Sequence, residues 1–233
     1  GSGCESSSWV SDSSVVCKLP SGRAFPHGVI VSAEVSSGSL TESFSYDAMV
    51  VSSTQFVNGP TTGGFVVTLF GKGFGNADTS VGGRVGGSAC ESSVWVSDTS
   101  MLCLFASGVG NSKSATVSVN LDVGTVTSFW SYDVPAVSSL KLTNGPVTGG
   151  SFVTVAGSGF GSAGYSVGVR VGGSGCESSS WVSDSSVVCV VGSGVGSAGK
   201  TVEVSSEVQV GSLTLFWSYD VPAVSSLKLT NGP

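Results

Sequence analysis

Apolar and polar residues alternate with a period of two along most of this chain. That pattern predicts β-strands with one buried face, because successive side chains of a strand point to opposite sides. No stretch shows the sustained 3.6-residue period of an amphipathic helix. The faces that we expect to be buried carry Val117, Val119, Leu121 and Val123 in the stretch 116–123, Val202, Val204, Val208 and Val210 in 201–210, and Leu213, Leu215, Trp217 and Tyr219 after it.

The same phrases return about every 86 residues. Cys4, Cys90 and Cys176 are spaced by 86 and 86, and SYDVPAVSSLKLTNGP occurs identically at 131–146 and 218–233. This period exceeds the ~20–50 residues of solenoid repeats and fits a small all-β domain with its own core. We divide the chain into 1–47, the C-terminal part of one repeat, 48–133 and 134–220, two complete repeats, and 221–233, the start of another.

Each repeat contains about seven short apolar runs between turn residues, which predicts an all-β, immunoglobulin-like β-sandwich. No linker separates the repeats, since the last strand of one passes through Asp133, Val134 and Pro135 into the next. We therefore expect tandem domains joined end to end by short, stiff junctions. Because the sequence starts and stops inside a repeat, we expect it to be a window of a longer array.

The composition argues against two classes of partner. Nine Lys and Arg stand against fifteen Asp and Glu, for a net charge of −6. Nucleic acid and anionic membrane surfaces both need a basic face, so we expect neither as a partner. Hydrophobic residues make up 40% of the chain, which argues against disorder. No run approaches the ~18 apolar residues of a membrane span.

All six cysteines lie in three copies of one fourteen-residue phrase, CESSSWVSDSSVVC at 4–17 and 176–189 and CESSVWVSDTSMLC at 90–103. We expect a strand, a reversal and a strand that returns to the first cysteine. A disulfide there closes a loop of about 14 residues and contributes roughly 3 kcal/mol to stability. Such bridges form in oxidising compartments, so we expect an extracellular or cell-surface protein. The disulfide prediction covers Cys4, Cys17, Cys90, Cys103, Cys176 and Cys189.

Two phrases, NGPTTGGFVVTLFGKGFG at 58–75 and NGPVTGGSFVTVAGSGFG at 144–161, resemble the opening of an IPT/TIG domain. The order that follows is also similar, with a V-x-V-G-G strand, two cysteines and a closing strand that carries an aromatic residue and Tyr. The resemblance implies an immunoglobulin-like fold in extracellular adhesion or scaffold modules, or in DNA-contacting modules of transcription factors. The acidic charge and the paired cysteines oppose the DNA-contacting alternative. The matching residues are Gly64, Gly71, Phe74, Gly75, Gly87, Cys90, Cys103 and Tyr132 in the first complete repeat, and Gly150, Gly157, Phe160, Gly161, Gly173, Cys176, Cys189 and Tyr219 in the second.

Three motifs suggest chemistry, and we favour a structural explanation for each. Residues 194–201 match the phosphate-binding pattern GxxxxGK[ST], but a strand-like stretch follows where that site needs a helix. GKGFG at 71–75 and GSGFG at 157–161 also lack a following helix, so we expect turn glycines. His27 could act as a general base, but we expect a surface residue in a loop that differs between repeats. We therefore predict no catalytic residue and no enzyme activity.

The acidic residues form no recognisable metal motif. One aspartate recurs in the cysteine phrase, as Asp12, Asp98 and Asp184, and we expect it to accept local backbone hydrogen bonds in a turn. Zinc needs four ligands, which two cysteines per repeat and one histidine in the chain cannot supply. Calcium needs about six to eight oxygen ligands. We expect no cofactor, with calcium at the domain junctions, near Asp133, as the alternative.

Serine and threonine side chains are candidate acceptors of O-linked glycans, whereas Asn-x-Ser/Thr sequons are absent. The candidates lie in serine runs and in turns beside proline. The alternative is that these hydroxyls are simply solvated. The candidate acceptors are Ser6, Ser7, Ser8, Thr61, Thr62, Thr148, Ser178, Ser179 and Ser180.

The sequence favours a structural role. Near-identical copies predict a segment of an extracellular filament, fibril or stalk, whose partners are neighbouring repeats or further copies of the chain. One alternative is the ligand-binding ectodomain of a cell-surface receptor or adhesin, which predicts divergent loops such as RAFPHG at 23–28. Another alternative is a spacer module in a secreted carbohydrate-active enzyme.

Overall fold

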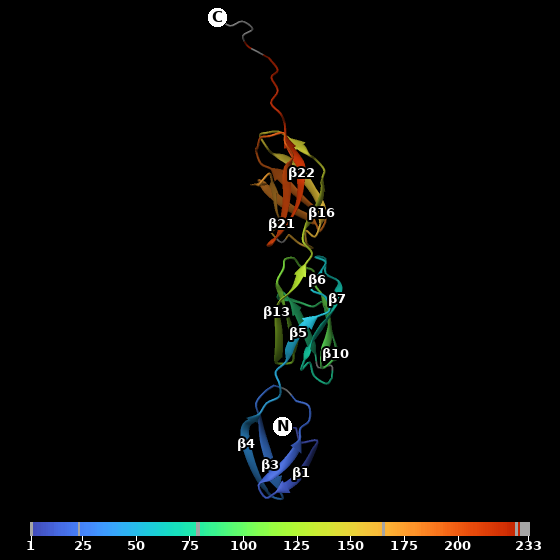
Figure 1. Ribbon diagram of the computed structural model, residues 1–233, viewed down its shortest axis with the longest axis vertical. Coiled ribbons are helices and arrows are strands. Elements are labelled where there is room, and N and C mark those ends of the chain that lie inside the picture. The colour runs from blue at the N-terminus through green and yellow to red at the C-terminus, as the bar shows by residue number, and fades with distance from the viewer. Residues whose placement is uncertain (1, 23, 78–79, 165, 227, 229–233) are drawn as a thin grey trace. The chain divides into compact units, whose positions relative to one another are not determined.

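A computed structural model describes residues 2–22, 24–77, 80–164, 166–226 and 228 (Figure 1). These residues form strands and no helix, as the alternating pattern predicts, so none of them belongs to a helix that could span a membrane. Of the segment 221–233, expected to begin another repeat, residues 227 and 229–233 lie outside the described part, as does Arg23. The chain divides into two compact units: unit 1 is Gly1–Val57, Phe65–Ala106 and Lys113–Trp130, and unit 2 is Asn58–Gly64, Ser107–Ser112 and Ser131–Pro233.

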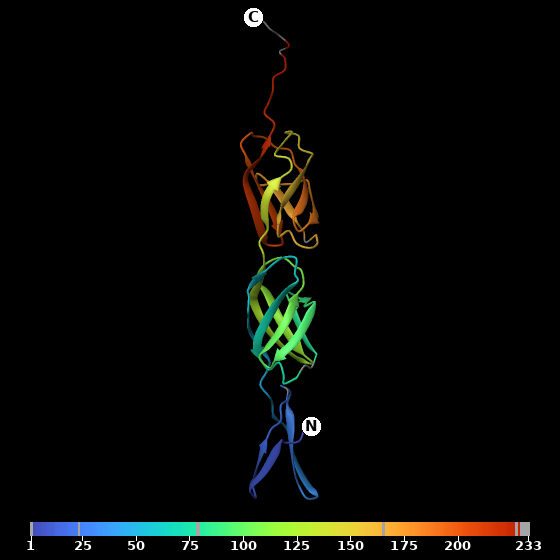
Figure 2. The same ribbon diagram turned by 90° about the vertical axis from the view of Figure 1, so that its right-hand side faces the viewer.

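The second complete repeat, 134–220, lies in unit 2 and is a sandwich of two sheets (Figure 2). One sheet has the strand order β14-β16-β20-β19 and the other β15-β22-β21-β17-β18. The pairs are antiparallel except that β15 lies parallel to β22. The strands are β14 (Ala136–Leu140), β15 (Asn144–Gly145), β16 (Ser151–Ser158), β17 (Gly168–Val171), β18 (Ser174–Gly175), β19 (Ser178–Ser183), β20 (Ser186–Val191), β21 (Lys200–Ser206) and β22 (Gln209–Tyr219).

The first complete repeat, 48–133, has the same two sheet orders, β10-β11-β7-β5 and β6-β13-β12-β8-β9. Most of it lies in unit 1, but β6 and the last two residues of β13 belong to unit 2, where they pair with each other. The strands are β5 (Val50–Thr54), β6 (Asn58–Gly59), β7 (Phe65–Lys72), β8 (Val81–Val85), β9 (Ser88–Ala89), β10 (Ser92–Ser97), β11 (Ser100–Phe105), β12 (Lys113–Val119) and β13 (Asp122–Tyr132).

The half repeat, 1–47, forms two hairpins in unit 1. Its apolar side chains stay exposed: Val31 is 49% exposed, whereas its counterpart Val117 is fully buried. The sheet that faces Val117 in the first complete repeat includes β5 and β7, and residues 1–47 contain no counterpart of these strands. The hairpins pair β1 (Ser6–Ser11) with β2 (Ser14–Lys18) and β3 (His27–Ala33) with β4 (Ser36–Phe44).

Alternation along the strands builds the core of each complete repeat. Inward positions of both sheets carry valine and aromatic side chains, so the two inner faces pack against each other. In the second complete repeat the largest fully buried side chains are Trp217 and Phe160, and in the first they are Trp130, Phe74 and Phe105. The buried cluster of the second repeat consists of Val137, Leu140, Val153, Val155, Phe160, Val169, Val171, Val187, Cys189, Val191, Val202, Val204, Trp217 and Tyr219.

In the hairpins β12–β13 and β21–β22, the buried face that we predicted is wrong for the residues that follow the turn. β12 turns into β13 at residues 120–121, where Asn120 has a positive φ of 56°. Val119 pairs with Asp122 across this two-residue turn, so the inward side passes from odd-numbered to even-numbered positions, and Leu121 and Val123 point to solvent although Val117 and Val119 are buried. The same happens at 207–208 in the second complete repeat. There Val208 and Val210 are exposed, and the polar Gln209 is buried in their place.

Leu215 is a second exception, because it is exposed while Trp217 and Tyr219 of the same strand are buried. The pairing of β22 with β21 jumps from Leu213↔Val202 to Trp217↔Lys200, so two extra residues bulge from β22. Leu215 lies in this bulge with a positive φ of 61°. An even number of extra residues preserves the inward face beyond the bulge.

The reversed faces predict different costs for two leucines of the first complete repeat. Leu69→Ala removes a fully buried side chain and is expected to lower the free energy of unfolding by about 2–5 kcal/mol. Leu121→Ala removes a side chain that is 79% exposed and is expected to change it by less than about 0.5 kcal/mol. Urea unfolding of the two variants measures both. Equal losses would contradict the position of the turn at 120–121.

Candidate functional site at the repeat junctions

Each cysteine phrase is a β-hairpin held by one disulfide. The bridges join Cys4 to Cys17, Cys90 to Cys103 and Cys176 to Cys189. The described residues include no free cysteine. A serine of the phrase also reaches the second sheet, since the hydroxyl of Ser179 accepts the N–H of Val169 at 3.0 Å. The phrase therefore connects the two sheets of a repeat.

The tryptophan of the phrase binds the glycine-rich loop that follows β7 or β16. Trp95 Nε1 donates to the carbonyl of Phe74 at 3.1 Å, and Trp181 Nε1 donates to that of Gly161 at 3.2 Å. Sequence spacing alone does not show this contact, because the loop and the tryptophan lie about twenty residues apart. The contact recurs in both complete repeats, which links the repeated phrase GxGFG to the repeated phrase CESSxWVSD.

The aspartate of the phrase holds the same loop, and the expectation of local turn bonds is wrong. Asp98 accepts the N–H of Gly75 at 2.9 Å and of Gly73 at 3.4 Å, so its partners lie more than twenty residues away. Both glycines have a positive φ, 81° at Gly73 and 93° at Gly75, which most residues avoid, so the expected turn glycines are present. The local turn bond goes instead to the hydroxyl of Ser97, which accepts the N–H of Thr99.

In unit 2, Asp184 has a third partner beyond the glycine-rich loop. It accepts the amides of Gly161 at 2.9 Å and Gly159 at 3.4 Å, as Asp98 does at the corresponding positions. The hydroxyl of Thr61 also donates to it at 2.6 Å. Thr61 belongs to the first complete repeat and Asp184 to the second, so this bond crosses a repeat junction inside one compact unit.

Gln209 makes the second polar contact of this junction. Its Nε2 donates to the carbonyl of Tyr132 at 3.0 Å, and its Oε1 accepts the N–H of Gly110 at 3.1 Å. The side chain is only 7% exposed. Gly211 brings the same hairpin against the entering chain, because a Cβ at this position would lie 1.9 Å from the carbonyl oxygen of Pro135. A side chain at 211 would thus push the hairpin away from the junction.

The two complete repeats differ in how far their end loops are buried. We call the segments 58–64 and 107–112 of the first repeat its end loops; both belong to unit 2. Val109 in these loops is 3% exposed, but its counterpart Val195 in the second repeat is 77% exposed. Thr61 is 2% exposed, and its counterpart Val147 is 41% exposed. Contact with the second repeat therefore accounts for the burial of the first repeat's end loops.

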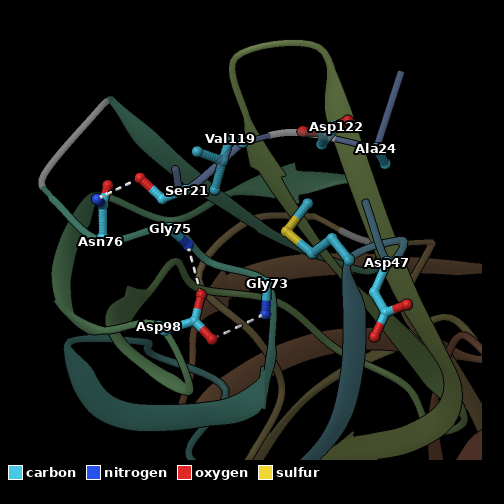
Figure 3. Close-up of a pocket in the computed structure, with 11 residues that line it drawn as sticks. Ser21, Ala24, Asp47, Gly73, Gly75, Asn76, Asp98, Val119 and Asp122 are labelled. Atoms are coloured by element: carbon cyan, nitrogen blue, oxygen red, sulfur yellow. Dashed lines mark hydrogen bonds between the residues drawn. The ribbon is translucent and has the colours of Figure 1, made fainter. Parts of the chain in front are cut away.

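Unit 1 contains a cavity of about 360 Å³ between the half repeat and the first complete repeat (Figure 3). On its rim, Asn76 Nδ2 donates to the hydroxyl of Ser21 at 2.7 Å. Figure 3 shows the carboxylates of Asp47, Asp98 and Asp122 at separate points of the lining, with Asp98 turned toward its glycine amides. Asp47 forms an exposed ion pair with Lys72, whose Nζ lies 3.8 Å away.

The carboxylates of this cavity do not come together as metal ligands. Among the residues that the structure describes, no group of three or more His, Cys, Asp or Glu side chains could hold a metal ion. Asp133, the residue considered for calcium, is exposed, and its backbone N–H donates to Gly59 at 2.9 Å. Calcium at the junctions stays a prediction without assigned ligands.

The remaining sequence motifs have structural positions. The phosphate-loop pattern at 194–201 leads into strand β21, so the helix that a phosphate site needs does not follow. His27 is not the surface loop residue that we expected. It begins β3, is half-buried, and its ring lies edge-on to Tyr46 with centroids 5.5 Å apart.

Two of the nine glycan candidates have occupied hydroxyls. Thr61 is buried and bonded to Asp184, and Ser179 is half-buried and bonded to Val169, so neither presents a free surface hydroxyl. Thr61 is therefore not a surface acceptor in this fold. The other seven remain predictions, and all are exposed: Ser6, Ser7, Ser8, Thr62, Thr148, Ser178 and Ser180.

Sequence reasoning missed Gln209 as a junction residue. The alternating pattern assigned the neighbouring valines to the core and left Gln209 on the solvent side. The turn that reverses the faces is marked in the sequence only by Ser205 and Ser206 before it and by Glu207 within it. The signal that could have found it is the glycine two residues later, Gly211, since a glycine in a strand often marks a close backbone approach.

The family model for the IPT/TIG domain matches residues 49–134 and 135–220. A comparison with curated proteins gives no match. Solved structures of similar fold include the plexin A4 extracellular region (22% identity, 74% of this chain and 18% of that one, TM-score 0.38). They also include a surface glycan-binding protein from Prevotella bryantii (12% identity, 73% of this chain and 42% of that one, TM-score 0.47). A third is the I9–I11 tandem of titin (12% identity, 94% of this chain and 90% of that one, TM-score 0.32). The chain thus spans less than a fifth of the plexin A4 chain, and the likeness concerns the fold alone.

Removing the carboxylate of Asp184 is expected to lower the stability of the protein, whereas removing that of its counterpart in the half repeat, Asp12, is not. Asp184→Ala leaves two loop amides and the Thr61 hydroxyl without their acceptor, and is expected to lower the free energy of unfolding by about 1–3 kcal/mol. Asp12→Ala is the matched control, because Asp12 is exposed and residues 1–47 contain no GxGFG loop. Urea unfolding compares the two. A loss at Asp12 as large as that at Asp184 would contradict the role of these bonds.

Proposed function

Because the chain belongs to the IPT/TIG domain family, we propose that it is a structural segment of an extracellular filament, fibril or stalk built from tandem IPT/TIG domains. The observation that carries the proposal is the burial of the first repeat's end loops within the compact unit of the second repeat. Domains that merely present independent binding surfaces do not need such shared units.

The disulfides support an extracellular location. A sandwich of about 86 residues, rich in valine, serine and glycine, has a light core, so a bridge worth roughly 3 kcal/mol is a large share of its stability. The cytosol keeps thiols reduced, and such bridges persist in secreted and surface proteins. One bridge per repeat would keep each domain folded while the array is exposed outside the cell.

The repeated sequence supports a mechanical role. In a repeat array, stability is roughly the sum of repeat terms and nearest-neighbour terms. The junction contacts of Thr61 and Gln209 are such a nearest-neighbour term. Identical residues at 131–146 and 218–233 would let a following repeat bond to the same closing strand, but Val147 stands where Thr61 does, so the Thr61 bond would not recur. Copies of the chain could extend the same contact as an open, heterologous assembly.

The proposal assigns no catalytic residue to the chain. Its partners are neighbouring repeats and further copies of itself, with covalent glycans on exposed hydroxyls. The chain is acidic, with a net charge of −6, so nucleic acid is not among the proposed partners.

Electron microscopy of the secreted, oxidised chain tests the proposal. We expect fibres with a regular axial repeat, because each chain would continue the same junction geometry. The matched control is protein reduced under mild conditions, which should lose the fibres as the sandwiches loosen. Monomers at all concentrations that bind cell surfaces would contradict the filament proposal and favour the ectodomain of a receptor or adhesin.

Intact mass spectrometry tests the disulfides and the glycans together. Reduction is expected to add six hydrogens, because all six cysteines are bridged. Protein secreted from a eukaryotic host is expected to carry added hexose-type mass on the exposed hydroxyls, and none at Thr61. A chain whose mass equals that of the bare sequence after secretion would remove glycans from the proposal.

A further inference from the structure

We infer that Gln209 couples the two complete repeats, so that the end loops of the first repeat open and close together with the hairpin β21–β22 of the second. Gln209 thereby acts as a positioning residue for the neighbouring repeat. The inference goes beyond the proposed function and does not depend on it, because coupling within one chain can be measured whether or not chains assemble.

The chemistry of the side chain suits this task. A glutamine carries both an acceptor oxygen and a donor nitrogen, so one side chain can satisfy an amide and a carbonyl at once. Gln209 does this with the amide of Gly110 and the carbonyl of Tyr132. Gly110 is buried, and a buried amide that loses its partner bears the full cost of its desolvation.

The two bonds act on a connected network of backbone hydrogen bonds. Gly110 accepts the N–H of Tyr132 through its own carbonyl at 2.9 Å, and Thr61 accepts that of Gly108 at 3.0 Å. Asp133 donates to the carbonyl of Gly59 at 2.9 Å. These bonds tie both end loops to the closing strand of the first repeat. Gln209 holds one side of the network and Asp184, through Thr61, holds the other.

The chain itself supplies a comparison at the corresponding position of the first repeat. Asp122 lies two residues before Gly124, as Gln209 lies two residues before Gly211. An ionised carboxylate accepts hydrogen bonds but cannot donate one to a carbonyl. Asp122 is half-buried and lines the open cavity of unit 1, whereas Gln209 is buried. The two positions therefore offer different chemistry to the preceding repeat.

Native-state hydrogen exchange on the full, oxidised chain tests the inference. In Gln209→Ala we expect the amides of Gly108, Gly110 and Asp133 to exchange roughly 10- to 100-fold faster together. Only Gly110 bonds to Gln209 directly, so acceleration at the other two reports coupling rather than a lost contact. Core amides of β7 and β16 are expected to keep their protection.

Two further variants make the test decisive. Gln209→Met keeps the length of the side chain without its polar atoms and is expected to reproduce the effect if Gln209→Ala folds poorly. Gln55→Ala is the control, because Gln55 is an exposed glutamine whose side chain bonds within its own repeat, to Thr68. It should leave the three amides unchanged. Acceleration of Gly110 alone, no acceleration, or equal acceleration of core and loop amides in both Gln209 variants would each overturn the inference.

Discussion

The structure depends on one constraint: backbone amides that leave water must find hydrogen-bond partners. Each repeat ends in glycine-rich loops that have little side-chain surface of their own to bury. In unit 2 the second repeat supplies two partners: the side-chain oxygen of Gln209 accepts the amide of Gly110, and the carboxylate of Asp184 accepts the hydroxyl of Thr61. The boundary of the compact unit consequently lies inside the first repeat, at its end loops, and not at the sequence junction.

The same constraint explains why two phrases recur together. The GxGFG loop turns with positive-φ glycines and leaves amides and carbonyls without strand partners. The cysteine hairpin meets both needs, since Trp181 donates to the loop and Asp184 accepts from it. The disulfide keeps this hairpin closed. A domain with a small valine core can therefore hold a long loop in place, and the same aspartate remains available to the neighbouring repeat.

Much of the fold follows from the sequence. The two-residue period, the 86-residue repeat and the IPT/TIG-like phrases predict tandem sandwiches, and the family match and the strands confirm the family and the fold. The wrong predictions concern residues whose burial or partners depend on turns, bulges and contacts between residues distant in sequence. Turns at 120–121 and 207–208 reverse the buried face, and a bulge turns Leu215 outward. Asp98 and Gln209 act on residues distant in sequence, and no local pattern reveals such partners.

The central claim is that the end loops of the first complete repeat fold with the second repeat, so that the two repeats unfold together. Differential scanning calorimetry of the oxidised chain tests it most directly, because it compares the total enthalpy of unfolding with the van't Hoff enthalpy of the transition. Coupled repeats should melt in one transition in which the two enthalpies agree for both complete repeats together. A van't Hoff enthalpy near half of the calorimetric value, or two separate transitions, would show that the repeats unfold independently and contradict the account.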